Sequence, residues 1–191
     1  MTEIQSLRAA YRQEKAAVMG GMAASVASTR GIHKVLRKLS SLTDGLLHTL
    51  WQRAEMPSGC ALVAVGGYGR AQLFPFSDVD VLLLLEGTQL DTDSALSRRI
   101  EGFIGSCWDA GLEIGSSVRT TSECLAESAA DVTVQTSLLE ARLICGNAAL
   151  FAHFQGQYQA QMDPKAFLVA KTLEMRQRHT KYDNTPYALE P

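Results

Sequence analysis

Several features that mark other classes of protein are missing from this 191-residue chain. A membrane helix needs about 20 apolar residues in a row, and the apolar run 79–85 is much shorter and contains Asp80. The N-terminus lacks the basic start and apolar core of a secretory signal. The formal net charge is only -2, so no basic surface for nucleic acid or membrane is indicated. These absences predict a cytoplasmic protein with no membrane or nucleic-acid partner.

Paired cysteines are also missing. The four cysteines are scattered through apolar stretches and form no C-x-x-C pair. This pattern predicts reduced, buried side chains rather than a disulfide or a zinc site. The cysteines are Cys60, Cys107, Cys124 and Cys145.

The order of hydrophobic patterns indicates an α+β protein. Apolar residues at three- and four-residue spacing predict helices over about 3–18 and 33–54, with a break at 19–28. Continuous apolar runs over 61–65 and 79–85 predict buried strands. A helix over about 94–110 and a strand over 114–120 follow, and Thr120 with Glu123 forms a capping-box pattern.

The last third is predicted to be helical. Asp131 is expected to cap a helix that carries Leu143 and ends at Gly146; a second runs to about Met162 and a third starts at Asp163. We therefore expect a helical segment over 1–56, a mixed core over 57–146 and a helical extension over 147–191. No closing element follows, so the chain is expected to be a fragment of a longer protein.

Two adjacent glycines follow the first predicted strand, at Gly66 and Gly67. Without Cβ atoms, such a turn lets backbone N–H groups approach an anionic oxygen closely. A helix starting near Gly69 would add its dipole, and Arg70 would add a charged fork for phosphate. A double glycine alone is most often an ordinary turn.

A carboxylate pair opens the second strand. Asp78 and Asp80 point to the same face, roughly 6–7 Å apart along the strand, because side chains alternate. Carboxylates placed in this way can hold Mg²⁺ for phosphoryl transfer, and an unpaired Asp80 would be costly within an apolar strand. The combination of strand, Gly-Gly, short connector, Ser-Asp-x-Asp and strand is much more specific than either part.

Two other glycine-loop sites are excluded by spacing. A dinucleotide fingerprint needs G-x-G-x-x-G opening a helix, whereas this chain has G-G-x-G and Pro75 soon after. A Walker A loop needs Gly-Lys-Ser/Thr, and no lysine occurs between Lys38 and Lys165. The glycine turn is therefore interpreted together with the aspartates.

Residues 66–84, which contain these motifs, resemble the N-terminal nucleotidyltransferase domain of the bifunctional uridylyltransferase/uridylyl-removing enzymes, which act on the PII nitrogen-signalling protein. The likeness continues through 112–120, 133–142, 177–179 and 187–191, and so covers nearly the whole chain. It implies a polymerase-β-like nucleotidyltransferase fold that transfers UMP from UTP to a tyrosine of PII.

The resemblance also implies a set of site residues. Gly66 and Gly67 would lie at the nucleotide phosphates, with Arg70 and Ser77 as further nucleotide-binding candidates. Asp78 and Asp80 would ligate Mg²⁺ or Mn²⁺ and act in catalysis. The wider fold has a third carboxylate that helps to deprotonate the attacking hydroxyl; Glu113 is the candidate, with Glu140 in reserve.

The chain departs from the family pattern at Ala71-Gln72, where Gly-Glu is usual, at Ser116, where His is usual, and at Ala188, where Asn is usual. None of these removes a metal ligand. The chain has no His-Asp dipeptide of the kind around which the family's UMP-removing domain is built, so that activity is expected to lie in other domains of the parent chain.

Three alternatives stay open at this point. The same motifs serve transferases that attach AMP or modify small molecules, and a catalytically silent nucleotide-binding module would keep them too.

The basic residues of the last helix predict either a wall for UTP, a docking face for an acidic partner or, more simply, a solvated surface. These residues are Lys165, Lys171, Arg176, Arg178, His179 and Lys181.

Overall fold

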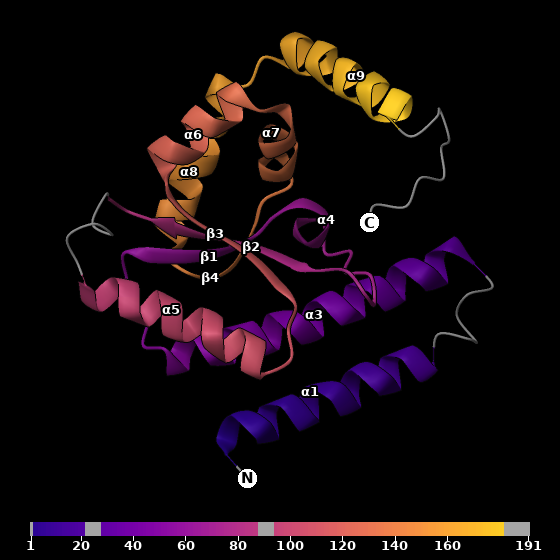
Figure 1. Cartoon of the computed structure of the whole chain (residues 1–191), viewed down its shortest axis with the longest axis vertical. Helices are drawn as coiled ribbons and strands as arrows, with labels where there is room; N and C mark the ends of the chain where they lie inside the picture. Colours follow the sequence, from indigo (N-terminus) through magenta and orange to yellow (C-terminus); the bar gives the residue numbers. More distant parts are fainter. Residues whose placement is uncertain (1, 22–27, 88–93, 182–191) are drawn as a thin grey trace.

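The computed structural model describes residues 2–21, 28–87 and 94–181 (Figure 1). Its strands are β1 (Cys60–Ala64), β2 (Val79–Leu85), β3 (Ile114–Thr120) and β4 (Arg142–Gly146). Its helices are α1 (Glu3–Gly20), α3 (Thr29–Arg53), α4 (Gly66–Gly69), α5 (Ser94–Asp109), α6 (Thr121–Ala130), α7 (Val132–Leu139), α8 (Ala148–Gln161) and α9 (Pro164–Lys181).

The four strands form one mixed sheet in the order β3-β2-β1-β4. β1 is antiparallel to both of its neighbours, and β2 pairs with β3 in parallel, with Asp80 opposite Gly115. The two central strands are apolar on both faces, which explains their continuous hydrophobic runs. Asp80 is the one exposed position of β2.

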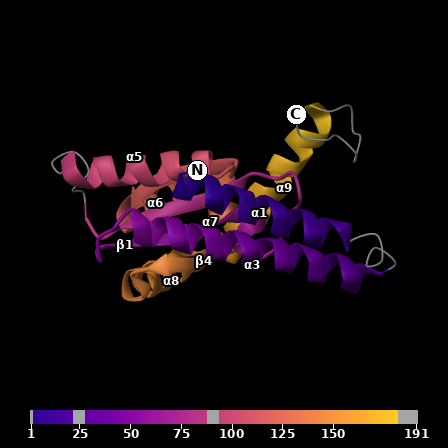
Figure 2. The same cartoon turned by 90° about the horizontal axis from the view of Figure 1, so that it is seen from below.

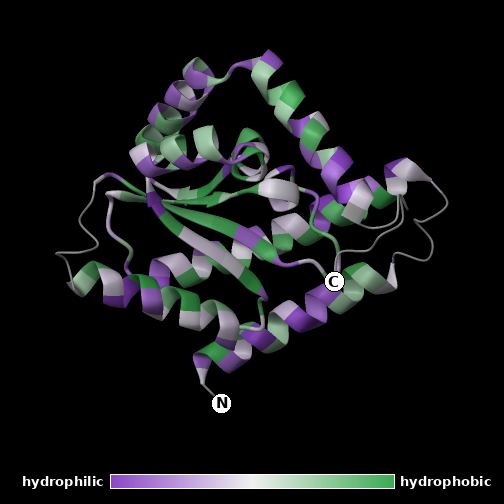
Figure 3. Cartoon of the chain, turned by 45° about the horizontal axis from the view of Figure 1, so that its top comes forward, coloured by the Kyte–Doolittle hydropathy of each residue, from purple (hydrophilic) through white to green (hydrophobic). Residues whose placement is uncertain are grey.

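Helices cover both faces of the sheet. On one face, Leu47 of α3 and Phe103 of α5 pack with Leu83 of β2, and side chains of α1 belong to the same cluster. On the other face, Leu138 of α7 and Phe154 of α8 pack with Leu82. Figures 1 and 2 show α1 running beside α3 below the sheet, and Figure 3 shows hydrophobic strands between the two helical layers. α9 lies farther out and contacts α7.

The α+β class expected from the sequence is confirmed, and the arrangement is compatible with a polymerase-β-like nucleotidyltransferase fold. Apart from the region 131–146, the helices and strands start and end close to the expected positions, and β2 and β3 match them. Thr120 and Glu123 form the expected capping box of α6. All four cysteines are free and buried, as predicted.

One expected element is wrong. The helix predicted to run from Asp131 to Gly146 ends at Leu139, and residues 142–146 form β4 instead. Arg142 and Leu143 pair with β1, so the backbone hydrogen bonds of an edge strand replace those of a longer helix. Local periodicity could not reveal this pairing, because the partner strand lies about 80 residues earlier in the sequence.

Parts of the predicted pattern fall outside the described residues. These are most of the break expected at 19–28 and the last family-like segment, 187–191, with Ala188. Among the described residues, no helix is long and apolar enough to span a membrane. The domain limits 1–56, 57–146 and 147–191 stay a prediction.

Candidate active site

The glycine turn lies between β1 and β2. Gly66 has φ +58°, a left-handed conformation that favours glycine, and it begins the one-turn helix α4. The N–H of Val65 donates to the carbonyl of Asp80 at 3.1 Å, which ties the turn to β2. The helix expected to start near Gly69 is instead the short helix α4, which ends at Gly69. Gly66 and Gly67 form its N-terminal end.

The carboxylate of Asp80 lies between the turn and β3. A Cβ atom built on Gly115 would come within 2.6 Å of its Oδ1, and one built on Gly66 within 3.8 Å of its Oδ2. Burial, and then the charge of Asp78, raise the pKa of Asp80 above its usual value. A carboxylate whose ionisation is disfavoured by burial and by a neighbouring negative charge is one that a bound cation would stabilise in its ionised form.

Asp78 and Ser77 precede β2 and are exposed. The backbone N–H of Ser77 donates to the carbonyl of Phe74 at 3.2 Å, closing a turn at Pro75. Neither Ser77 nor Asp78 lines the cavity described next. The electrostatic effect on Asp80 places Asp78 near that carboxylate, whereas no contact supports a nucleotide-binding role for Ser77.

A cavity of about 670 Å³ joins the turn, the sheet and α9. Gly66, Gly67 and Asp80 line one side of it, and Arg70 lies at the same end. Lys171 and Arg178 of α9 line it as well. A space of this size with three cationic side chains near a glycine turn suits a polyphosphate.

The sequence did not predict the hydroxyl groups of this cavity. Thr133, Thr136 and Ser137 of α7 line it, together with Ser116 and Ser117 of β3. The spacing of Thr133, Thr136 and Ser137 by three and four residues places them on one face of a helix. Only the fold shows that this face is directed toward the glycine turn. Hydroxyls of this kind provide both donors and acceptors for a bound nucleotide.

The two candidate third carboxylates differ in position. Glu140 lines the cavity and pairs with Arg70. Glu113 is exposed and does not line it; its backbone carbonyl accepts a hydrogen bond of 2.7 Å from Val79. In the part of the chain that is described, no group of three or more His, Cys, Asp or Glu side chains is gathered for a metal ion. The catalytic role of Glu113 therefore stays a prediction.

The basic residues of α9 divide into two groups. Lys171 and Arg178 face the cavity, and Glu174 holds both through ion pairs of 2.9 and 3.0 Å. Lys165 and Arg176 are exposed and do not line the cavity. The position of Lys171 and Arg178 supports the hypothesis that this part of α9 forms one wall of a nucleotide site. It does not support that role for Lys165 and Arg176.

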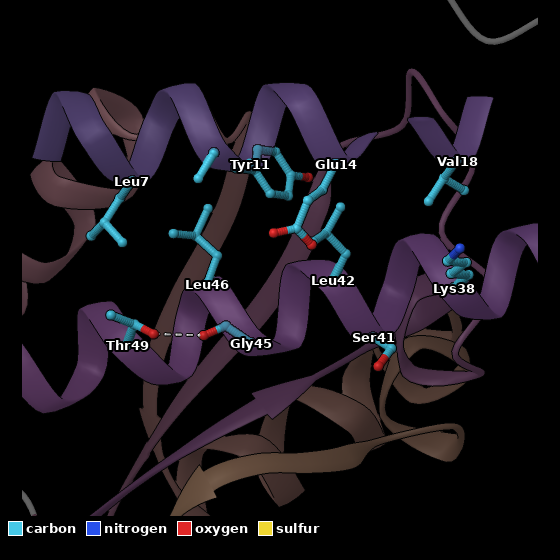
Figure 4. A pocket seen from close by; sticks show the side chains of 11 residues that line it. Leu7, Tyr11, Glu14, Val18, Lys38, Ser41, Leu42, Gly45, Leu46 and Thr49 are labelled. Atoms are coloured by element: carbon cyan, nitrogen blue, oxygen red, sulfur yellow. Dashed lines mark hydrogen bonds between the residues drawn. The ribbon is translucent and has the colours of Figure 1, made fainter. Parts of the chain in front are cut away.

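A second cavity, of about 470 Å³, lies between α1 and α3 (Figure 4). Its lining is mainly apolar, with Leu7, Leu42 and Leu46 among the residues that point into it. It contains neither the glycine turn nor the aspartates. The chemistry expected from the sequence therefore belongs to the first cavity.

A glycine turn beside a carboxylate-bearing strand, in a small mixed sheet with flanking helices, is compatible with the class of nucleotidyltransferase folds. No protein-family model matches the chain. Named relatives do match it. The bifunctional uridylyltransferase/uridylyl-removing enzyme of Cupriavidus metallidurans is 58% identical over 160 residues, which are 84% of this chain and 18% of that protein.

The enzyme of the same name from Burkholderia orbicola is 51% identical over 191 residues, 99% of this chain and 21% of that protein. The one from Burkholderia mallei is 50% identical over 186 residues. The chain is homologous to one part of the bifunctional uridylyltransferase/uridylyl-removing enzymes, and it spans only 18–21% of the length of these relatives. The resemblance found in the sequence is thus confirmed.

Proposed function

We propose that this chain is the uridylyl-transferring part of its protein and moves UMP from UTP to a tyrosine of the PII signalling protein. The observation that carries the proposal is the cavity that combines the glycine turn, Asp80 and three cationic side chains. The names of the relatives support a uridylyl group rather than an adenylyl group.

Each wall of the cavity has a part in this reaction. The first N–H groups of a helix have no partner within it, so those at Gly66 and Gly67 are suited to bind phosphate oxygens. Arg70, Lys171 and Arg178 supply positive charge for the β- and γ-phosphates. The tyrosine hydroxyl oxygen attacks the α-phosphorus, the bond to the β-phosphate oxygen breaks, and pyrophosphate leaves with its charge balanced by these side chains.

The donor set at β2 fits a divalent cation. Asp78 and Asp80 offer carboxylate oxygens, which Mg²⁺ and Mn²⁺ prefer. Burial, and then the charge of Asp78, raise the pKa of Asp80, and positive charge beside it would favour its ionised form. When bound, the cation stabilises charge on the attacking and leaving oxygens. Asp78 and Asp80 would hold it, and the hydroxyl proton passes to a carboxylate at the site.

Glu113 remains the proposed third carboxylate, with Glu140 as the alternative. Glu140 is already paired with Arg70, so it is also suited to hold that guanidinium at the phosphates. For the whole protein we propose a cytoplasmic location and further domains. The UMP-removing activity that the names of the relatives include would lie in those domains.

The test is transfer of labelled UMP to PII by the full-length protein, with Asp80→Asn as the variant. Removing one charged metal ligand is expected to lower kcat by at least about 100-fold, without loss of the folded state. Glu101→Gln, an exposed carboxylate on α5, is the matched control and is expected to keep wild-type activity.

Three results would contradict the proposal. A preference for ATP over UTP would indicate an adenylyl-type enzyme. Equal transfer by the wild type and Asp80→Asn would contradict the assignment of Asp80 to the metal site. Nucleotide binding without any transfer to a protein or small molecule would indicate a silent nucleotide-binding module.

A further inference from the structure

Behind the glycine turn, on the side away from the cavity, three polar side chains from distant parts of the sequence meet. Arg142 of β4 makes two hydrogen bonds to the carboxylate of Asp44 on α3, at 2.9 and 3.1 Å. The hydroxyl of Tyr68, within α4, donates to the same carboxylate at 2.5 Å. The carboxylate therefore joins α3, α4 and β4.

Arg142 also binds the backbone of the turn. Its Nε donates to the carbonyl of Gly69 at 3.3 Å and its Nη2 to that of Tyr68 at 3.4 Å. The guanidinium lies 5.5 Å from the centroid of the Tyr68 ring, within the range of a cation–π contact. These carbonyls form the C-terminal end of α4, where a helix leaves acceptors unsatisfied.

The backbone just before β4, at the end of α7, approaches the turn very closely. A Cβ atom at Gly69 would lie 2.2 Å from the carbonyl oxygen of Glu140, so only glycine fits there. α3 is itself held in place next to Asp44, because the hydroxyls of Tyr11 and Thr43 lie 3.0 Å apart. The turn is thus fastened to two elements that do not touch the proposed nucleotide.

Tyr68 is only 2% exposed, and Asp44 and Arg142 have side chains that are 29% and 30% exposed. None of the three lines the cavity. Burial, and then the charge of Asp44, raise the pKa of Tyr68, so its hydroxyl stays protonated and keeps donating. A helix of four residues cannot hold its own conformation in water, so contacts of this kind have to hold it.

We propose that Asp44, Tyr68 and Arg142 are positioning residues that hold Gly66 and Gly67 in the geometry that binds the UTP phosphates. They set the affinity for nucleotide without contacting it. The inference rests on the proposed function for its kinetic consequence, but its structural consequence, an ordered turn, can be measured without any substrate.

The test uses Asp44→Asn in the full-length protein. Asparagine keeps an acceptor for Tyr68 but loses the charge that Arg142 pairs with. We expect the KM for UTP to rise about tenfold, as for loss of one charged hydrogen bond, with the KM for the acceptor protein unchanged. Amide hydrogen exchange over 66–69 is expected to become faster than in the wild type.

Glu127→Gln is the matched control. It breaks the ion pair with Arg119, at 2.6 Å, which joins β3 to α6 away from the turn; the side chains of Arg119 and Glu127 are 26% and 47% exposed. It should lower thermal stability to a similar extent and leave both the KM for UTP and the exchange at 66–69 unchanged. A general loss of stability would alter both variants alike.

The outcomes separate the two proposals. An Asp44→Asn protein with wild-type exchange at 66–69 and wild-type KM for UTP would overturn the positioning role. If the wild type transfers no UMP, the proposed function fails, and the exchange measurement still decides whether these residues order the turn. If Asp44→Asn does not fold, Tyr68→Phe, which removes a single hydroxyl, is measured in the same way and must give faster exchange.

Discussion

Replacing Gly115 by alanine changes the position of the Asp80 carboxylate without changing the carboxylate itself. The two residues lie opposite each other on β3 and β2. The new Cβ atom would lie 2.6 Å from Oδ1 of Asp80, whereas ordinary contact begins at 3.4 Å. Because the atom in the way is the end of a flexible side chain, the carboxylate moves by about 0.8 Å and the backbone stays in place.

The magnitude follows from this displacement. A misplacement of about 1 Å at a reacting group can lower the rate about 100-fold, so kcat/KM for UMP transfer is expected to fall by about two orders of magnitude. The stability should hardly change. An off-rotamer side chain costs about 0.5–1.5 kcal/mol, and replacing a strand glycine by alanine gains roughly 0.5–1 kcal/mol.

The assay combines UMP transfer with thermal unfolding of the full-length protein. Gly156→Ala is the control, because nothing lies within 4 Å of a Cβ atom at that exposed position of α8. It should raise stability by up to about 1 kcal/mol and leave the activity unchanged. If Gly115→Ala folds and retains activity within a factor of about two, the reasoning about Asp80 is refuted.

Two further predictions concern α9 and α6. Lys171→Gln is expected to raise the KM for UTP several-fold, with a smaller effect at high salt, whereas Lys165→Gln on the same helix should not; equal effects would contradict the cavity wall. Hydrogen bonds from Thr120 lower the pKa of Glu123 in the folded protein, so its ionised form contributes stability at neutral pH that is lost as the pH falls through that lowered value. The difference in melting temperature between wild type and Glu123→Gln should therefore shrink on acidification, and a constant difference would contradict this.

Most elements could be predicted from local patterns. β2 and β3 have the expected limits, and the capping box of Thr120 and Glu123 opens α6 as predicted. β4 was missed, because an edge strand of mixed burial has no strong periodicity of its own. Its partner β1 lies far away in the sequence, so only the folded sheet stabilises it.

The site shows the same division. That Gly66, Gly67 and Asp80 lie together could be predicted, because their proximity depends on short-range spacing within one strand–turn–strand unit. The participation of Lys171 could be proposed only as one of several roles for a basic helix, and no pattern indicated that Arg142 would pair with Asp44. Arg142 and Asp44 are 98 residues apart in the sequence, and Lys171 is about as far from the glycine turn.

By itself the sequence determined the α+β class, the glycine turn and the carboxylate pair, since each depends on neighbouring residues and on strand alternation. The tertiary structure decided which residues surround that pair. It brought α9 to one side of the turn as a cationic wall, and it fastened the other side to Asp44 through Arg142. Those arrangements depend on how the helices pack on the two faces of the sheet, which long-range burial decides rather than local spacing.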